Sequence, residues 1–149
     1  MDTEFDRIER EITIDAPTER VWALVAEPGW YINDDRMVEH EVRRDGDVSY
    51  VTDPKYGTFA FRTVQLDEPN YAAFRWHIDT ENLDSSSTLV EFWLTPTESG
   101  VLLKVAESGF ASLDEPEADR RSRFDDHFDG WPQELEIARK HLTGVAAGA

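Results

Sequence analysis

The last third of the chain carries a stripe of apolar residues with helical spacing. Its members follow one another at intervals of four and three residues, which places them on one face of a helix. A continuous apolar face has to be covered by another part of the molecule. The pattern therefore predicts a long C-terminal helix packed on a second element. The stripe consists of Phe124, Phe128, Trp131, Leu135, Ala138 and Leu142.

Gly130 and Pro132 stand on either side of Trp131 within this stripe. Proline removes the amide donor that would serve the carbonyl of Phe128, and its ring clashes with the preceding turn, so a kink or a break is expected. A kink would open the mouth of a cavity beside the helix. Alternatively, Gly130 ends one helix and Pro132 begins the next, with no functional consequence.

Most of the chain before the stripe alternates apolar and polar residues, as strands with one buried face and one wet face do. Asp45-Gly46 is a strong hairpin signal, because both central residues of the tight turn need a positive φ. The run around Phe92 is apolar on both faces except at Glu91, which predicts a strand in the interior of the sheet. The predicted strands cover residues 8–15, 38–44, 48–52, 59–63, 71–78, 89–94 and 101–107.

Two short helices are predicted between the first strand and the second. Pro17 fits the first turn of a helix, where its missing amide donor has no partner to lose. Pro28-Gly29 ends this helix, and residues 30–32 form a second short helix or a turn. The apolar face of the first helix contains Val21, Leu24 and Val25, with Trp22 beside them.

Together these elements predict an α+β fold in which a curved antiparallel sheet of about six or seven strands wraps around the C-terminal helix. A chain of 149 residues suits one domain, spanning 1–149, that buries about two thirds of its unfolded surface. We expect an ordered core over residues 8–142 and a disordered tail over residues 143–149.

The charge of the chain restricts its partners. Asp and Glu number 32 against 15 Lys and Arg, which gives a formal net charge of −17. Such a field repels phosphate backbones and anionic lipid, so neither nucleic acid nor a membrane surface is an expected partner. The acidic composition has two explanations that stay open: a high-salt environment, or a genome that favours Arg over Lys.

The sequence also narrows the compartment and the cofactors. Cysteine is absent, which excludes disulfides and thiolate metal sites. The first residues lack the basic and apolar regions of a secretion signal, and no apolar run is long enough to cross a membrane. A cytoplasmic protein is the natural interpretation. Motifs for nucleotide, flavin or metal binding are absent too, so no cofactor and no metal are expected.

Glu107 is the clearest polar candidate for a site. It shares the parity of Leu103 and Val105 in its predicted strand, which directs it toward the apolar interior, where an unpaired carboxylate is costly. Such a carboxylate orients a ligand hydroxyl or acts as a base with a raised pKa. The alternative is a structural role at the end of the strand, close to water or paired with an arginine.

His127 is the second candidate for acid–base chemistry. It flanks the apolar stripe, one residue before Phe128, and its ring could line a cavity. The alternative is packing at the helix edge with one ring nitrogen in solvent. Asp125 and Asp129 lie nearby but face away from it, so an acidic solvated surface is expected there instead of a metal site.

Aromatic side chains from the strands and the helix are candidate walls of a pocket, because small-molecule sites are mostly apolar with a few placed polar groups. The alternative is that these residues fill the core. With the neighbouring aliphatic positions and the carboxylate, the candidate ligand-binding set is Phe59, Phe61, Phe74, Trp76, Phe92, Leu103, Val105, Glu107, Phe124, Phe128 and Trp131.

Several short motifs in a fixed order resemble a known superfamily. They are Ile12-Thr13-Ile14-Asp15-Ala16-Pro17 with Val21-Trp22, Phe74-Arg75-Trp76, the turn at Gly100, Glu107-Ser108-Gly109-Phe110, and Gly130-Trp131. Over residues 8–142 the chain resembles the START-like or SRPBCC superfamily of helix-grip, Bet v 1-like proteins. Within it, the chain resembles the family named for the activator of the heat-shock protein 90 ATPase. The resemblance implies a helix-grip fold, in which a partial cavity between sheet and helix is common.

Three functions follow from these observations. The first is a protein that binds a hydrophobic or amphipathic small molecule, lipid-like or polyketide-like, between sheet and helix. The second is an enzyme of the polyketide cyclase or dehydratase kind, with Glu107 or His127 as the acid–base group. The third is a module that binds a heat-shock ATPase. A cavity is needed for the first two functions, whereas a filled core suffices for the third. The sequence leaves open whether the chain is a monomer or a homodimer.

Overall fold

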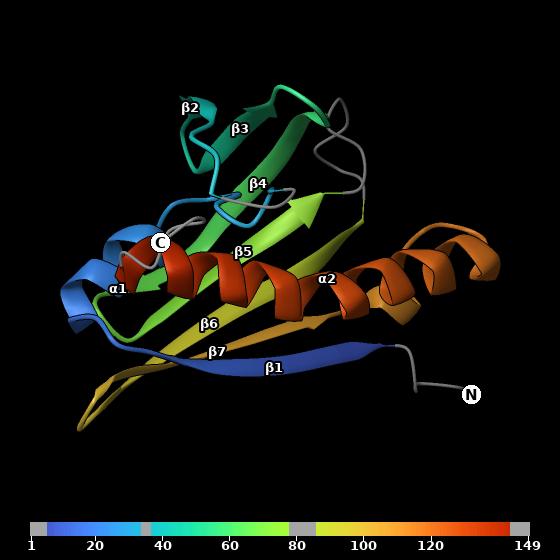
Figure 1. Cartoon of the computed structure of the whole chain (residues 1–149). Coiled ribbons are helices and arrows are strands. Elements are labelled where there is room, and N and C mark those ends of the chain that lie inside the picture. Colours follow the sequence, from blue (N-terminus) through green and yellow to red (C-terminus); the bar gives the residue numbers. More distant parts are fainter. Residues whose placement is uncertain (1–5, 34–36, 78–85, 144–149) are drawn as a thin grey trace.

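A seven-stranded antiparallel sheet curves around one long helix in the computed structural model of this chain (Figure 1). The structure describes residues 6–33, 37–77 and 86–143. The strand order is β1-β7-β6-β5-β4-β3-β2, so only β1 pairs with a strand distant in sequence. The strands are β1 (Arg7–Ile14), β2 (Glu41–Asp45), β3 (Val48–Asp53), β4 (Gly57–Asp67), β5 (Tyr71–His77), β6 (Ser87–Thr97) and β7 (Gly100–Ser108), and the helices are α1 (Thr18–Val25), η1 (Phe110–Ser112) and α2 (Glu117–Thr143).

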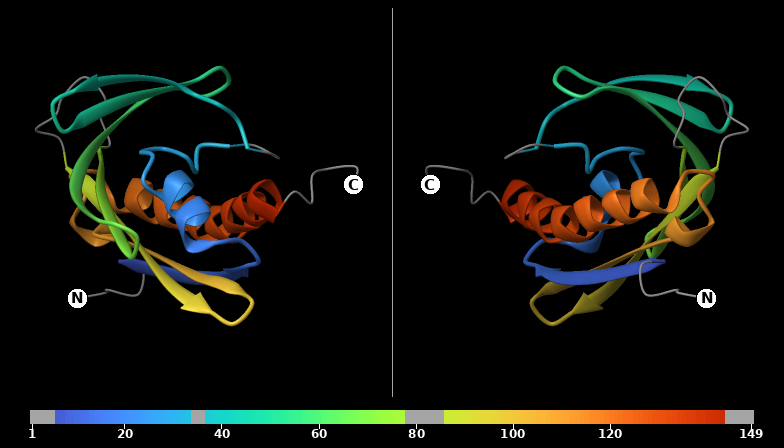
Figure 2. Two further views of the ribbon diagram at one scale, coloured as in Figure 1. Left: turned by 90° about the vertical axis from the view of Figure 1, so that its left-hand side faces the viewer. Right: turned by 90° about the vertical axis from the view of Figure 1, so that its right-hand side faces the viewer.

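The predicted α+β helix-grip fold is confirmed. Figure 2 shows the sheet closing around α2 on three sides, with α1 beside the helix. The predicted hairpin joins β2 to β3, but its two turn residues are Gly46 and Asp47, because Asp45 belongs to β2 and pairs with Val48. Of these two residues only Gly46 has a positive φ, 64°, whereas the prediction placed Asp45 and Gly46 in the turn, both with positive φ. Gly100 opens β7 against the end of β1, where an added Cβ would lie 2.1 Å from the carbonyl oxygen of Ile14. No side chain fits at that position.

The segment after α1 takes the predicted alternative of a turn and not that of a second short helix. Residues 26–32 form turns, with the amide of Ile32 donating to the carbonyl of Gly29, and the described residues contain no second helix there. Within α1, Val21, Trp22 and Val25 are buried while Leu24 is only half-buried. The physical reason is packing. Trp22 has more apolar surface to bury than Leu24, and the amphipathic face rotates to cover it.

The helix α2 runs without interruption from Glu117 to Thr143 and includes Pro132. The predicted alternative of two helices is therefore wrong, because burial of Trp131, Leu135 and Ala138 against the sheet outweighs the one hydrogen bond that proline removes. Thr143, expected in a disordered tail, belongs to this helix, and residues 144–149 lie outside the described residues.

The core occupies the space between the concave face of the sheet and α2. The inward side chains of β4, β5, β6 and β7 are fully buried there, and the inner face of α2 covers them. These strand residues are Phe61, Phe74, Phe92, Leu103 and Val105. The strands have the predicted parity, and β6 lies in the interior of the sheet as expected. No helix in the described part of the chain has the length and apolar character needed to cross a membrane.

Candidate functional site

The candidate site is built around Glu107, one residue before the end of β7. The carboxylate has the inward parity of Leu103 and Val105, as predicted, and its residue has 0% exposure. Its strand neighbours are Val90 on β6 and Ile8 on β1. Because the surroundings are apolar, this carboxylate needs hydrogen-bond donors from the protein itself.

Three side chains supply those donors. Thr88 Oγ1 donates to one carboxylate oxygen over 2.6 Å, and Trp131 Nε1 donates to the other over 2.9 Å. The third contact joins His127 Nδ1 to the same oxygen as Trp131, at 2.8 Å. One hydrogen lies in this contact, and it is assigned to His127 Nδ1 with the carboxylate oxygen of Glu107 as the acceptor. The ring nitrogen Nε2 is then the one left to meet a ligand.

The ring of His127 is fixed by aromatic neighbours as well. It stacks on Trp76 with the ring centroids 4.8 Å apart and the planes inclined by 20°, and Phe110 meets it edge-on at 5.4 Å. Its side chain is 19% exposed. His127 thus lies at the edge of the helix, as predicted, and its ring also contacts buried residues of the core. A histidine held in this way, with one ring nitrogen free of a protein partner among the described residues, can bind a ligand or transfer a proton.

A small pocket of about 110 Å³ opens beside this histidine. Its walls come from the turn after α1, from β5 and from α2: Tyr31, Trp76, Asp126, His127, Gly130, Trp131 and Glu134. A cavity of about 150 Å³ holds one benzene molecule. The pocket is smaller than that, so it admits the edge of a ring or a short aliphatic end, while the remainder of the ligand would lie outside.

Tyr31 is a member of the site that sequence reasoning missed. It is buried, and its ring centroid lies 4.9 Å from that of Trp131 and 5.3 Å from that of Trp76. Its hydroxyl has no hydrogen-bond partner among the described residues. Burial, followed by the negative charge of Glu107, raises the pKa of Tyr31 well above its usual value, so the phenol keeps its proton. The only signal in the sequence was the aromatic run after Pro28-Gly29.

The structure divides the predicted site residues into three groups. Trp76, His127 and Trp131 line the pocket, with Glu107 directly behind them. Phe59 is half-buried against the edge of Trp76, and Phe124 is buried against Phe110. The remaining buried residues, which belong to the filled core and do not line the pocket, are Phe61, Phe74, Phe92, Leu103 and Val105.

Phe128 was predicted to line the pocket, but in the structure it does not. Its side chain is 42% exposed and lies under the guanidinium of Arg10, 4.1 Å from the ring centroid. At about 100° per residue, Phe128 is turned about 60° from Trp131 on one side and His127 about 40° on the other. The histidine therefore takes the inward position that the apolar pattern had assigned to the phenylalanine.

The side chains around the pocket restrict the kind of ligand that it can bind. Asp126 and Glu134 place carboxylates on the pocket wall, which disfavours an anionic ligand. Within residues 6–33, 37–77 and 86–143, no group of three or more histidine and acidic side chains is placed to hold a metal ion.

Comparison with known proteins shows the family of the chain and the proteins that share its fold. The family model described as "Activator of Hsp90 ATPase homolog 1-like protein" matches residues 15–142. No curated protein matches the sequence.

Among solved structures, protein MLL2253 from Mesorhizobium loti has 19% identity and a TM-score of 0.70, with 94% of this chain and 98% of that one covered. The Aha1 dimer from Colwellia psychrerythraea has 17% identity and a TM-score of 0.63, covering 91% and 95%. DynU16, a protein of the dynemicin biosynthetic locus, has 17% identity and a TM-score of 0.66, covering 93% of this chain and 47% of that one. At such identities, the likeness shows the fold.

Proposed function

The chain belongs to the family of Activator of Hsp90 ATPase homolog 1-like proteins, and from that premise we propose that it binds the ring-bearing end of a small apolar or amphipathic molecule between β5 and α2. The observation that carries this proposal is the pocket between Trp76 and Trp131, with His127 held in a fixed orientation on its wall. Apolar walls with a few oriented polar groups are typical of small-molecule sites.

The polar groups indicate the chemistry of the ligand. His127 offers Nε2 as an acceptor once Nδ1 donates to Glu107. The enclosed hydroxyl of Tyr31 lacks an internal acceptor among the described residues and would become a donor to the ligand if its ring turned toward the pocket. Both groups are compatible with a neutral ring that carries a carbonyl or hydroxyl group. The carboxylates of Asp126 and Glu134 and the net charge of −17 disfavour fatty acids and other anions.

The pocket can be closed by a substitution that the backbone tolerates. A Cβ added at Gly130 meets no atom within 4 Å, and Gly130 lines the pocket. Gly130→Leu therefore places a side chain at the pocket wall without a backbone clash. Gln133→Leu is the matched control, because Gln133 is an exposed residue of the same helix that does not line the pocket.

The test is thermal unfolding against flat aromatic, polyketide-like and lipid-like compounds. A ligand at about 100 times its dissociation constant adds about 2.7 kcal/mol, which raises the midpoint of a domain of this size by about 5 to 11 °C. We expect the shift for a neutral aromatic compound to persist in Gln133→Leu and to disappear in Gly130→Leu. An equal shift in Gly130→Leu would refute the proposed pocket, and no shift with any compound would favour binding to a heat-shock ATPase.

A second function, an enzyme of the polyketide cyclase or dehydratase kind, is favoured by one specific observation. The 2.8 Å contact between Glu107 and His127 is the arrangement of a histidine base oriented by a carboxylate. His127 would remove a proton next to a ligand carbonyl, and the Tyr31 hydroxyl would donate to the oxygen that gains negative charge. For any compound that binds, product formation lost in His127→Gln while the thermal shift is retained would establish this activity.

A further inference from the structure

A polar hollow of about 290 Å³ adjoins the pocket of the proposed function. Asp126 and His127 line both spaces, so the pocket and the hollow meet at these two side chains, which form the junction. The other lining residues precede them in the sequence, so the hollow extends from the junction toward the N-terminal end of α2. A ligand with its ring edge in the pocket therefore has a polar space beside it for its remainder. The hollow is lined by Glu115, Asp119, Ser122, Arg123, Asp126 and His127.

The hollow carries an excess of negative charge. Three of its side chains are carboxylates and one is a guanidinium. Arg123 donates from Nε and Nη2 to the two carboxylate oxygens of Glu115, over 2.9 Å each, so these two charges offset one another. Asp119 and Asp126 are exposed, and their spacing of seven residues places them on one face of α2. Asp126 has neither an ion pair nor a side-chain hydrogen bond among the described residues, so its charge is open to a ligand.

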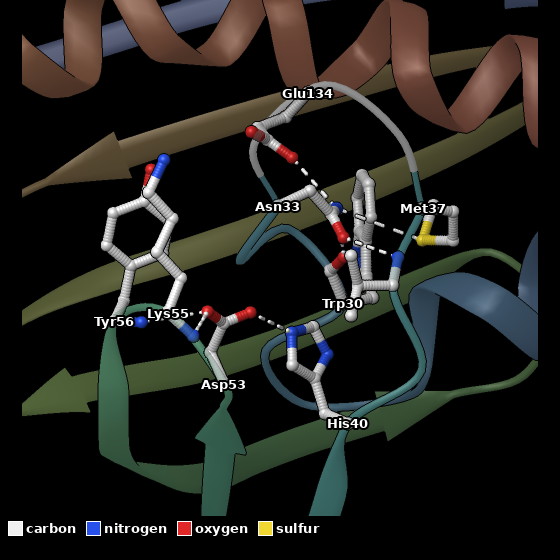
Figure 3. A network of polar contacts seen from close by, with 9 residues as sticks. Trp30, Asn33, Met37, His40, Asp53, Lys55, Tyr56 and Glu134 are labelled. Carbon is white, nitrogen blue, oxygen red and sulfur yellow. Dashed lines mark hydrogen bonds and ion pairs between the residues drawn. The ribbon is translucent and has the colours of Figure 1, made fainter. Parts of the chain in front are cut away.

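The polar atoms at the junction are hydrogen-bond acceptors. The Asp126 carboxylate only accepts, and His127 Nε2 accepts when Nδ1 holds the hydrogen of the contact with Glu107. Two turns further along α2, Glu134 adds another carboxylate to the pocket wall, one oxygen of which accepts from Asn33 Nδ2 over 2.9 Å (Figure 3). A ligand group that lies at the junction therefore has to donate hydrogen bonds.

A protonated amine suits this position better than a hydroxyl group or a metal ion. A hydroxyl group donates one hydrogen bond and is uncharged, whereas an ammonium group donates up to three and is attracted to Asp126. The net charge of −17 adds to the attraction for any cation. For a metal ion, the described residues offer no group of three or more histidine and acidic side chains placed to hold it.

The proposed function puts the edge of a ring between Trp76 and Trp131, which leaves the adjoining part of the ligand at the junction. We propose that this part is a protonated amine that donates to the Asp126 carboxylate and to His127 Nε2, so that the ligand is an amphipathic cation. The proposal rests on the proposed function, because without a ring in the pocket only the weak attraction of exposed charges would hold the amine.

The experiment compares three probes that share a phenyl ring and differ in charge: phenethylamine, phenethyl alcohol and phenylacetate. At neutral pH the amine is protonated and the carboxylate is ionised. NMR titrations of the full chain follow the amide signals of the pocket and the hollow. We expect the amine to bind about fivefold more tightly than the alcohol in dilute buffer, and phenylacetate to bind most weakly. Because salt screens exposed charges, about 0.5 M KCl should remove most of the difference between amine and alcohol.

Asp126→Asn removes the charge at the junction and keeps the shape of the side chain. It should weaken binding of the amine by about two- to fivefold and leave binding of the alcohol unchanged. Asp125→Asn is the matched control, because it removes the same charge from an exposed position of the same helix that lines neither space. It should change the affinity for the amine by clearly less than Asp126→Asn does.

The outcomes separate this proposal from the proposed function. Equal affinity for amine and alcohol, with both lost in Gly130→Leu, would overturn the cationic ligand and leave the pocket in place. Equal weakening of the amine by Asp125→Asn and Asp126→Asn would overturn it too, since the attraction would then come from the net charge alone. Binding that persists in Gly130→Leu, or no binding by any probe, would overturn the pocket and the amine together.

Discussion

At the scale of single residues, the site depends on a carboxylate that is fully enclosed. Glu107 accepts from Thr88, Trp131 and His127, and these donors come from β6 and α2. The carboxylate therefore joins the helix to the sheet. Its removal leaves three donors that each lose their acceptor, whereas an amide of the same size keeps most of the contacts.

We expect Glu107→Ala to lower the free energy of unfolding by about 3 to 5 kcal/mol, the cost of breaking a buried charged contact. Glu107→Gln should cost about 1 kcal/mol, because its carbonyl still accepts from Trp131 and His127 while the Thr88 hydroxyl rotates to accept from the amide. Urea unfolding of both variants measures the difference. Equal losses in the two variants would contradict this account of the network.

For Tyr31 we predict a substitution that raises the free energy of unfolding instead of lowering it. Its buried hydroxyl has no acceptor among the described residues, so Tyr31→Phe removes an unsatisfied group without changing the shape of the ring. Stability should rise by about 1 kcal/mol. Any carbonyl ligand of the pocket should bind more weakly, which a thermal-shift titration detects. Lower stability in Tyr31→Phe would indicate that the hydroxyl has a structural partner.

At the scale of the elements, the sequence predicted which side chains of each strand face the core. Burial alternates along β6 and β7, and the inward position of Glu107 follows from its two-residue spacing to Val105. Along α2, the period of 3.6 residues is not a whole number, and the pattern therefore placed Phe128 inside and His127 at the margin. The structure reverses these two positions.

The turn between α1 and β2 could not be read from the sequence, because it has no periodicity. Asn33 and Glu134 are 101 residues apart, and no local pattern connects them. The contact between the rings of Tyr31 and Trp131 joins the same two parts of the chain. The predicted site consequently contained core phenylalanines and lacked the tyrosine.

Pro132 in α2 offers a test of helix stability. It is exposed within the helix and cannot donate to the carbonyl of Phe128. Pro132→Ala restores that donor and should raise the free energy of unfolding by about 1 to 3 kcal/mol. The exposed neighbour Gln133→Ala should change it by less than about 0.5 kcal/mol. A loss of stability in Pro132→Ala would show that the helix is adapted to the proline.

The turn between β3 and β4 gives a pH-dependent prediction. Burial opposes ionisation of Asp53, but hydrogen bonds from the Tyr56 and Lys55 amides and from His40 outweigh it and lower its pKa below the usual 3.8. A group with a lowered pKa stabilises the fold above its unfolded pKa, and this contribution is lost as the pH falls through its folded pKa.

Asp53→Ala should therefore lower the free energy of unfolding by about 2 to 3 kcal/mol near neutral pH. Below about pH 4, the free energies of unfolding of the variant and of the unmodified protein should become more similar. Urea unfolding at a series of pH values measures this difference. The exposed Asp125→Ala should have little effect at any pH. A difference that does not change with pH would contradict the ionised state of Asp53.

At the scale of the whole molecule, the dominant property is the net charge of −17. Repulsion among carboxylates destabilises the compact state, and salt screens it. We expect the midpoint of thermal unfolding to rise by about 2 to 8 °C between dilute buffer and 1 M KCl, with most of the rise below about 0.5 M. A falling midpoint would contradict this. A continued rise above about 1 M would favour adaptation to high salt.

The pairing of β1 with β7 has a consequence for synthesis on the ribosome. Ile8 is translated long before Glu107, which lies opposite it, and the described sheet gives β1 no neighbour other than β7. While the intervening chain is being made, the apolar side of β1 has no strand to join. Completion of the sheet is thus delayed until β7 has emerged, and the nascent chain carries an unpaired strand while β2 to β6 are being made.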